Sequence, residues 1–169
     1  MTVNLFSIVD LHRRALATID HLLTRGLERA AALGVTEGQM LDWRLVEDMR
    51  PLGFQIGVVI NFAQQWPARV AGLPVPADVT ADLDVAGFRA AIAKATTFAG
   101  ALTPDQFEDR DTVPLTYRIG EGMEPTLPSG RWLTVFSTSN LYFHLTTAYA
   151  ILRANGAALG KVDFFPAGL

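Results

Sequence analysis

The side chain with the most versatile chemistry in this chain is His144, near the C-terminus. Apolar residues surround it at helical spacing, namely Leu141, Leu145, Ala148, Ile151 and Leu152. This pattern predicts a helix over residues 140–153 that turns His144 inward together with Asn140 and Thr147. An inward imidazole could act as a general base, a lone metal ligand or a hydrogen-bonding anchor for a small molecule. It could also be a core histidine whose hydrogen bonds are satisfied by Asn140, Thr147 or a backbone carbonyl.

Two further polar residues share the inward orientation. Gln55 lies in an apolar row formed by Leu52, Ile56, Val59, Phe62, Ala63 and Trp66, where it could bridge two helices or face a cavity. His12 lies in a row with Leu5, Val9, Leu16 and Ile19, and could complete a group with Gln55 and His144. His21 follows His12 by nine residues, which places it on the opposite helix face, and we expect it in solvent.

Four helices are predicted to position these side chains. The first extends from Leu5 to a stop at Gly34, and the second begins near Met49-Arg50-Pro51. The loop 73–76 contains two prolines and separates the second helix from a third over 85–102. The fourth helix is predicted to start with the N-cap oxygens of residues 137–139 and to end at Asn155-Gly156.

The segment between the third and fourth helices has a different pattern. Val113, Leu115, Tyr117 and Ile119 alternate with polar residues, and turn-forming glycines and prolines follow before a second apolar run, Trp132–Phe136. This pattern predicts a β-hairpin or two short strands. The sequence therefore predicts an all-α fold, a four-helix bundle with an inserted β-hairpin, in a single domain over residues 1–169.

Composition narrows the class of protein. Half of the 169 residues are apolar, which is enough for a substantial core. Seventeen acidic and fourteen basic residues give a net charge of -3, and the absence of a Lys/Arg run argues against nucleic acid as a partner. The chain has no cysteine, which excludes disulfides, thiolate metal sites and cysteine nucleophiles. Without a signal peptide or an apolar run of about 20 residues, we expect no membrane association and a cytoplasmic protein.

Several stretches resemble the DUF1993 family over essentially the whole chain. They are residues 48–56 (DMRPLGFQI), 73–76 (LPVP), 142–153 (YFHLTTAYAILR) and 155–164. That uncharacterised family is grouped with DinB/YfiT-like proteins, which are proposed metalloenzymes. The resemblance implies a DinB-like four-helix bundle, commonly dimeric, in which three histidines hold a divalent metal.

The resemblance also assigns positions to the metal ligands. In metal-binding relatives one histidine comes from the second helix and two, four residues apart, come from the fourth. The matching residue on the second helix is Gln55. On the fourth helix His144 matches one ligand, with Asn140 four residues before it and Ala148 four residues after it, so one histidine of three remains in either register. Because amides are weak neutral donors to transition metals, we expect a degenerate metal site and no cofactor. Zn or Ni bound with the help of His144 is the alternative.

The function expected from these residues is small-molecule binding in a pocket around Gln55, Asn140 and His144, with contributions from His12 and Thr147. A divalent-metal-dependent hydrolase or thiol-dependent transferase is one alternative. A non-catalytic dimeric interaction protein is the other. The apolar tail, residues 160–166, is expected to fold back on the bundle or to cross to a partner chain, and it hints at a homodimer.

Overall fold

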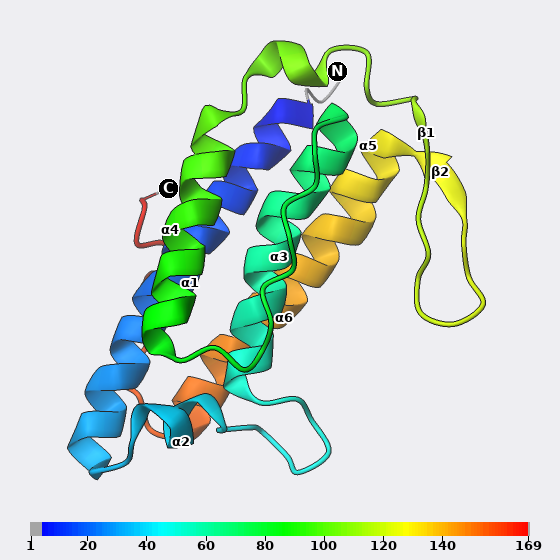
Figure 1. The fold of residues 1–169 in the computed structure, drawn as a ribbon. Coiled ribbons are helices and arrows are strands. Elements are labelled where there is room, and N and C mark those ends of the chain that lie inside the picture. The colour runs from blue at the N-terminus through cyan, green and yellow to red at the C-terminus, as the bar shows by residue number, and fades with distance from the viewer. Residues whose placement is uncertain (1–4, 169) are drawn as a thin grey trace.

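Four long helices form the body of the molecule. In the computed structural model, which describes residues 5–168, these helices are α1 (Leu5–Leu33), α3 (Leu52–Ala71), α4 (Val85–Ala101) and α6 (Thr138–Ala154) (Figure 1). The shorter elements are α2 (Glu37–Leu41), η1 (Pro104–Phe107), β1 (Pro114–Thr116), β2 (Thr126–Pro128), α5 (Ser129–Arg131), η2 (Trp132–Ser137) and η3 (Lys161–Phe164). The predicted helical bundle with a β-hairpin between its last two long helices is confirmed.

The long helices do not simply alternate in direction. Figure 1 shows α1 and α6 running one way and the neighbours α3 and α4 running the other way. The connection 72–84 must therefore return along the whole length of α3, and the predicted loop at 73–76 is its first part. Asn61 on α3 holds this connection by two hydrogen bonds with the backbone of Val79, at 2.8 and 2.9 Å. Gly53 allows the close approach, because a Cβ there would lie 3.1 Å from the carbonyl oxygen of Ala81.

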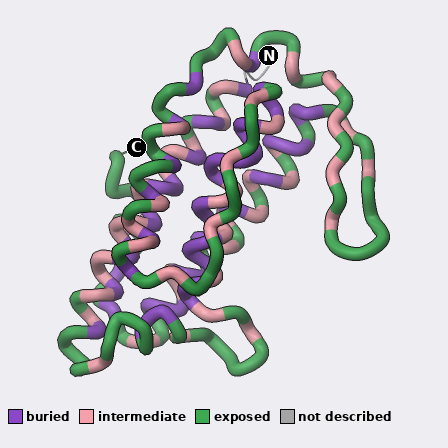
Figure 2. Tube along the Cα trace, viewed as in Figure 1, coloured by how far each residue is buried: buried purple, intermediate pink, exposed green. Residues whose placement is uncertain are grey.

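The core consists of two apolar clusters that follow each other along the bundle. One is built around Leu16, Ile56, Phe88, Leu141 and Leu145, and the other around Val9, Trp66, Phe107, Trp132 and Leu133. Figure 2 shows the buried residues on the inner sides of the long helices and the exposed ones along the hairpin and the end loops. Trp66, predicted in the apolar row of the second helix, is buried and stacks on Trp132 with ring centroids 5.2 Å apart.

The observed helix ends agree with three of the predicted signals. Gly34 and Gly156 follow α1 and α6 with φ values of 68° and 82°, a conformation that glycine adopts without strain. Pro51 occupies the N-cap position of α3. The short helix α2 was not predicted, although Thr36 and Gln39 form a capping box whose spacing is visible in the sequence.

The start of the fourth helix and the second strand were predicted wrongly. The helical course begins at Ser129 and continues through α5, the π-helical segment η2 and α6, so Trp132–Phe136 is helical and the second strand is Thr126–Pro128. Residues 137–139 therefore lie inside the helix and do not cap it. A short apolar run fits a strand and a buried helix equally well. The burial of Trp132 against Trp66, and the bond from its indole Nε1 to Leu115 O at 2.8 Å, favour the helix.

Among residues 5–168, no helix combines the length and the apolar character that crossing a bilayer requires.

Candidate functional site

The centre of the candidate site is a hydrogen bond between two long helices. Nδ1 of His144, on α6, lies 2.7 Å from Oε1 of Gln55, on α3. The amide nitrogen Nε2 of Gln55 donates to the carbonyl oxygen of Arg50 at 3.0 Å. Arg50 lies just before the start of α3. Gln55 is only 3% exposed, whereas His144 is partly exposed. The structure therefore brings together Gln55 and His144, two of the five predicted ligand-binding residues.

These bonds determine which nitrogen of His144 carries the proton. Because Gln55 Nε2 donates to a carbonyl that can only accept, Oε1 is the amide atom that faces the histidine. An oxygen in that place accepts a hydrogen bond, so Nδ1 of His144 is the protonated nitrogen. Nε2 then carries a lone pair, and the structure gives it no hydrogen-bond partner among residues 5–168. The arrangement presents an oriented acceptor at the surface of α6.

The protonation state of His144 follows from its surroundings. Burial lowers the pKa of His144 below its ordinary value, because the charged imidazolium is less well solvated there. Gln55 is neutral and does not offset this effect as a carboxylate would. The ring is therefore uncharged at neutral pH, with its Nε2 lone pair available to a donor or a proton.

Aromatic rings and one cation surround the histidine. Phe54 and Phe143 contact the His144 ring edge-on, with centroids 6.0 and 5.2 Å away. The guanidinium carbon of Arg50 lies 5.4 Å from the centre of the Phe54 ring, so Phe54 contacts both the cation and the histidine. Arg50 forms no ion pair within the described part of the chain. Phe143 is 61% exposed, a large apolar side chain in solvent beside a polar site.

Sequence reasoning missed Arg50, Phe54 and Phe143 as part of this site. The position of each residue in the sequence could have indicated its place in the site. Phe54 and Phe143 directly precede Gln55 and His144, and Arg50 lies one helical turn before Phe54, so the three residues flank the predicted pair.

Asn140 and Thr147 do not join the pair. The amide of Asn140 donates from Nδ2 to Phe136 O at 2.7 Å, and the hydroxyl of Thr147 donates to Phe143 O at 2.8 Å. Both bonds go to carbonyls four residues earlier on the same helical course, a common way for such side chains to be satisfied inside a helix. Among the predicted ligand-binding residues, these two have a local structural role.

His12 is buried as predicted, but it lies at a different position along the bundle axis from Gln55 and His144. Its Nε2 lies 3.4 Å from Oγ of Ser137, and both residues are 0% exposed. Ser137 precedes His144 by seven residues, about 10 Å along a helix, which separates His12 from Gln55 and His144. Burial lowers the pKa of His12 to about 4, and its Nδ1 has no partner among the described residues. His12 is a neutral polar residue at the junction of the two apolar clusters.

The donors around His144 do not fit a resident divalent metal. Within residues 5–168, no group of three or more histidine, cysteine, aspartate or glutamate side chains converges on one point. One nitrogen of His144 is engaged with Gln55, and the residues beside the second are the rings of Phe54 and Phe143. Transition metals require several imidazole, thiolate or carboxylate ligands, so no chemical step is assigned to a metal here.

Comparison with known proteins gives a family and a fold. Residues 6–165 match the family described as "Domain of unknown function (DUF1993)", and the chain therefore belongs to that family. Among solved structures, it is similar to the crystal structure of a DinB family member protein from Shewanella denitrificans, with a TM-score of 0.84 and 26% sequence identity. The similarity covers 95% of this chain and 90% of the other. No curated protein matches the chain. The DUF1993 membership and DinB-like fold implied by the sequence resemblance are confirmed.

Proposed function

We propose that this DUF1993 protein binds a small aromatic acid at the surface between α3 and α6, without a resident metal. The observation that carries the proposal is the 2.7 Å bond from His144 Nδ1 to Gln55 Oε1. It holds a neutral imidazole with Nε2 directed away from Gln55. Nε2 has no hydrogen-bond partner among the described residues, so its lone pair is available to a ligand.

The surrounding residues define the class of ligand. Phe54 and the exposed Phe143 suit an aromatic or apolar body. Arg50, which has no ion-pair partner among the described residues, suits an anionic group. His144 Nε2 suits a hydroxyl or amine donor. A ring that carries a carboxylate at one end and a hydroxyl at the other matches all three requirements.

The test is a titration of the untagged protein with 4-hydroxybenzoate, followed through the imidazole resonances of His144. Benzoate lacks the hydroxyl and phenol lacks the carboxylate, so each should bind about tenfold more weakly than 4-hydroxybenzoate. Arg50→Gln should weaken 4-hydroxybenzoate but leave phenol unchanged, because only the carboxylate contacts the guanidinium. Gln55→Met, which keeps the chain length and loses the amide, should weaken both hydroxylated probes.

The matched control is Arg118→Gln, which removes the same charge from an exposed position in the hairpin. It should bind all three probes like the native protein. The proposal fails if the His144 resonances do not move, or if the three probes bind with equal affinity to native protein and to Arg50→Gln.

We also propose that the chain forms a homodimer through its C-terminal segment. Val162 and Phe165 are 80% and 44% exposed and border one shallow cavity, and an exposed apolar patch is a common feature of protein–protein contacts. Light scattering should give twice the chain mass of 18.4 kDa for native protein and a smaller mass for Val162→Glu. A monomer in both samples contradicts the dimer.

A further inference from the structure

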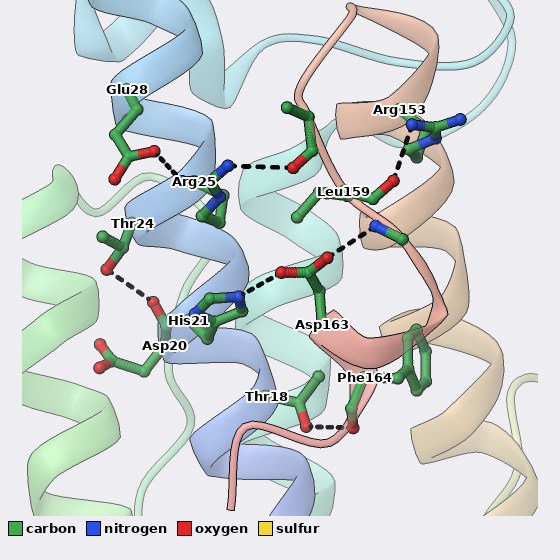
Figure 3. A network of polar contacts seen from close by, with 12 residues as sticks. Thr18, Asp20, His21, Thr24, Arg25, Glu28, Arg153, Leu159, Asp163 and Phe164 are labelled. Atoms are coloured by element: carbon green, nitrogen blue, oxygen red, sulfur yellow. Dashed lines mark hydrogen bonds and ion pairs between the residues drawn. The ribbon is translucent and has the colours of Figure 1, made fainter.

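The last residues of the described chain cross back over the bundle and lie against α1. We call residues 157–168 the C-terminal strap. Hydrogen bonds between the strap and side chains of the bundle join Arg25 to Ala158 O, Arg153 to Leu159 O, His21 to Asp163 and Thr18 to Phe164 O, at 2.7–3.0 Å (Figure 3). Arg14 donates a further bond to Gly168 O at 2.9 Å. The tail thus folds back on the bundle, which was one of its two predicted placements.

The prediction for His21 changes with this observation. His21 was expected in solvent, but its Nε2 lies 2.8 Å from the carboxylate of Asp163, and Figure 3 shows the two side chains directed at each other. Asp163 also accepts the backbone N–H of Gly160 at 2.6 Å. That bond and the bond with His21 lower the pKa of Asp163. The strap is therefore fixed at several points along its length.

The strap covers a cavity of about 270 Å³ between α1 and α6. Leu11 and Ala15 from α1, Leu145 from α6, and Phe164 and Phe165 from the strap form its apolar walls. A dry apolar cavity of about 150 Å³ holds one benzene ring. The space here is therefore large enough for a short acyl chain.

One end of the cavity is polar. Arg14 lines it and uses Nε for Asp10 and Nη1 for Gly168 O, which leaves Nη2 without a partner among the described residues. The Arg14–Asp10 pair lies at the surface, with side chains 39% and 53% exposed, and such pairs contribute little to stability. Tyr142 also lines the cavity, and burial raises the pKa of its hydroxyl, which remains a neutral donor. The charges of Arg14 and Asp10 act on the pKa of that hydroxyl in opposite directions.

We propose that this cavity binds a short-chain carboxylic acid, with the acyl chain between Ala15, Leu145 and the strap, and the carboxylate at Arg14 and Tyr142. The site is separate from the site proposed at His144. Neither Gln55 nor His144 lines the cavity. The two proposals therefore stand or fail independently.

Calorimetric titration of the native protein with butanoate, hexanoate, octanoate and octanol tests this inference. Affinity should rise about fourfold for each added methylene until the cavity is full, because each methylene leaves water. Octanol should bind about tenfold more weakly than octanoate, because it lacks the charge-assisted bonds to Arg14. Octanoate should shift the ring resonances of Tyr142 and leave those of His144 in place.

Two variants and one control locate the binding. Ala15→Leu fills the cavity and should abolish octanoate binding, and Leu11→Phe serves the same purpose if Ala15→Leu does not fold. Arg14→Gln should reduce octanoate to the affinity of octanol, whereas Arg118→Gln should change nothing. The inference is overturned if affinity is independent of chain length, if a folded cavity-filling variant binds like the native protein, or if octanoate does not bind at about 1 mM.

Discussion

Gln55 has an amide where the resemblance implies a histidine, and this difference changes the chemistry available to His144. In the DinB-like arrangement implied by the sequence, Gln55 occupies the position of a metal-binding imidazole. Here Oε1 of the Gln55 amide instead accepts a hydrogen bond from Nδ1–H of His144 and thereby fixes the direction of Nε2. Because Gln55 is neutral, the histidine is oriented without being charged. In the proposed function, this polar pair is the recognition group at the position where the resemblance implies a metal site.

The Gln55–His144 pair could be predicted from sequence because both residues interrupt apolar helical rows. The hydrogen-bond partners of Asn140, Thr147 and His12 could not be predicted in this way. Periodicity determines the helix face on which a residue lies. It does not determine which residues of two neighbouring helices lie at the same position along the bundle axis. It also cannot decide between a bond to a neighbouring helix and one to a carbonyl four residues earlier.

Buried His12 should make folding stability depend on pH. Its pKa is about 4 in the folded protein and 6.5 in the unfolded chain. Above pH 6.5 the ring is uncharged in both states. As pH falls below 6.5, the unfolded chain takes up the proton first, so the free energy of unfolding falls, by about 3 kcal/mol near pH 4.

Urea unfolding between pH 7 and pH 4 measures this effect. His12→Leu should remove most of the loss attributed to the ring, because leucine does not titrate. Val135→Ala, a change without a titrating group at a position that is 56% exposed, should keep the native pH dependence over this range. Parallel curves for native protein and His12→Leu would show that the buried ring does not titrate as argued.

At the scale of elements, the π-helical segment η2 decides how the fourth helix meets the core. A π-turn contains more residues than an α-turn. It therefore changes the angle about the helix axis between the side chains that precede it and those that follow it. Through η2, Trp132 and Leu133 face one apolar cluster while Leu141 and Leu145 face the other. No local pattern in Trp132–Phe136 distinguishes this arrangement from a strand. For that reason the sequence analysis placed a strand there.

Inserting one alanine after Val135 tests the role of this segment. The π-turn already contains one residue more than an α-turn, so a further residue should rotate Trp132 by about 100° relative to α6. Trp132 would leave its stacked position on Trp66, and the cost should be at least about 3 kcal/mol in urea unfolding. Val135 is 56% exposed, so Val135→Ala should change stability by no more than about 0.5 kcal/mol. An insertion as mild as Val135→Ala would show that η2 does not set the register.

At the scale of the whole molecule, the sequence was sufficient for the bundle, its four long helices and the position of the hairpin. The parallel course of α3 and α4 was not predicted. It depends on the connection 72–84 lying along α3, where Asn61 holds it and Gly53 leaves room for it. Neither a glycine nor an asparagine in a helix reveals from sequence alone which distant segment it contacts. The same limit applies to the cavity under the strap, which exists only because the tail returns to α1.

The proposed function requires an oriented histidine without a resident metal in this DinB-like bundle. Elemental mass spectrometry on untagged protein, repeated for His144→Ala, tests this requirement. We expect zinc, nickel and iron far below one atom per chain in both samples. About one metal atom per native chain, lost in His144→Ala, would contradict it and assign the site to metal-dependent chemistry.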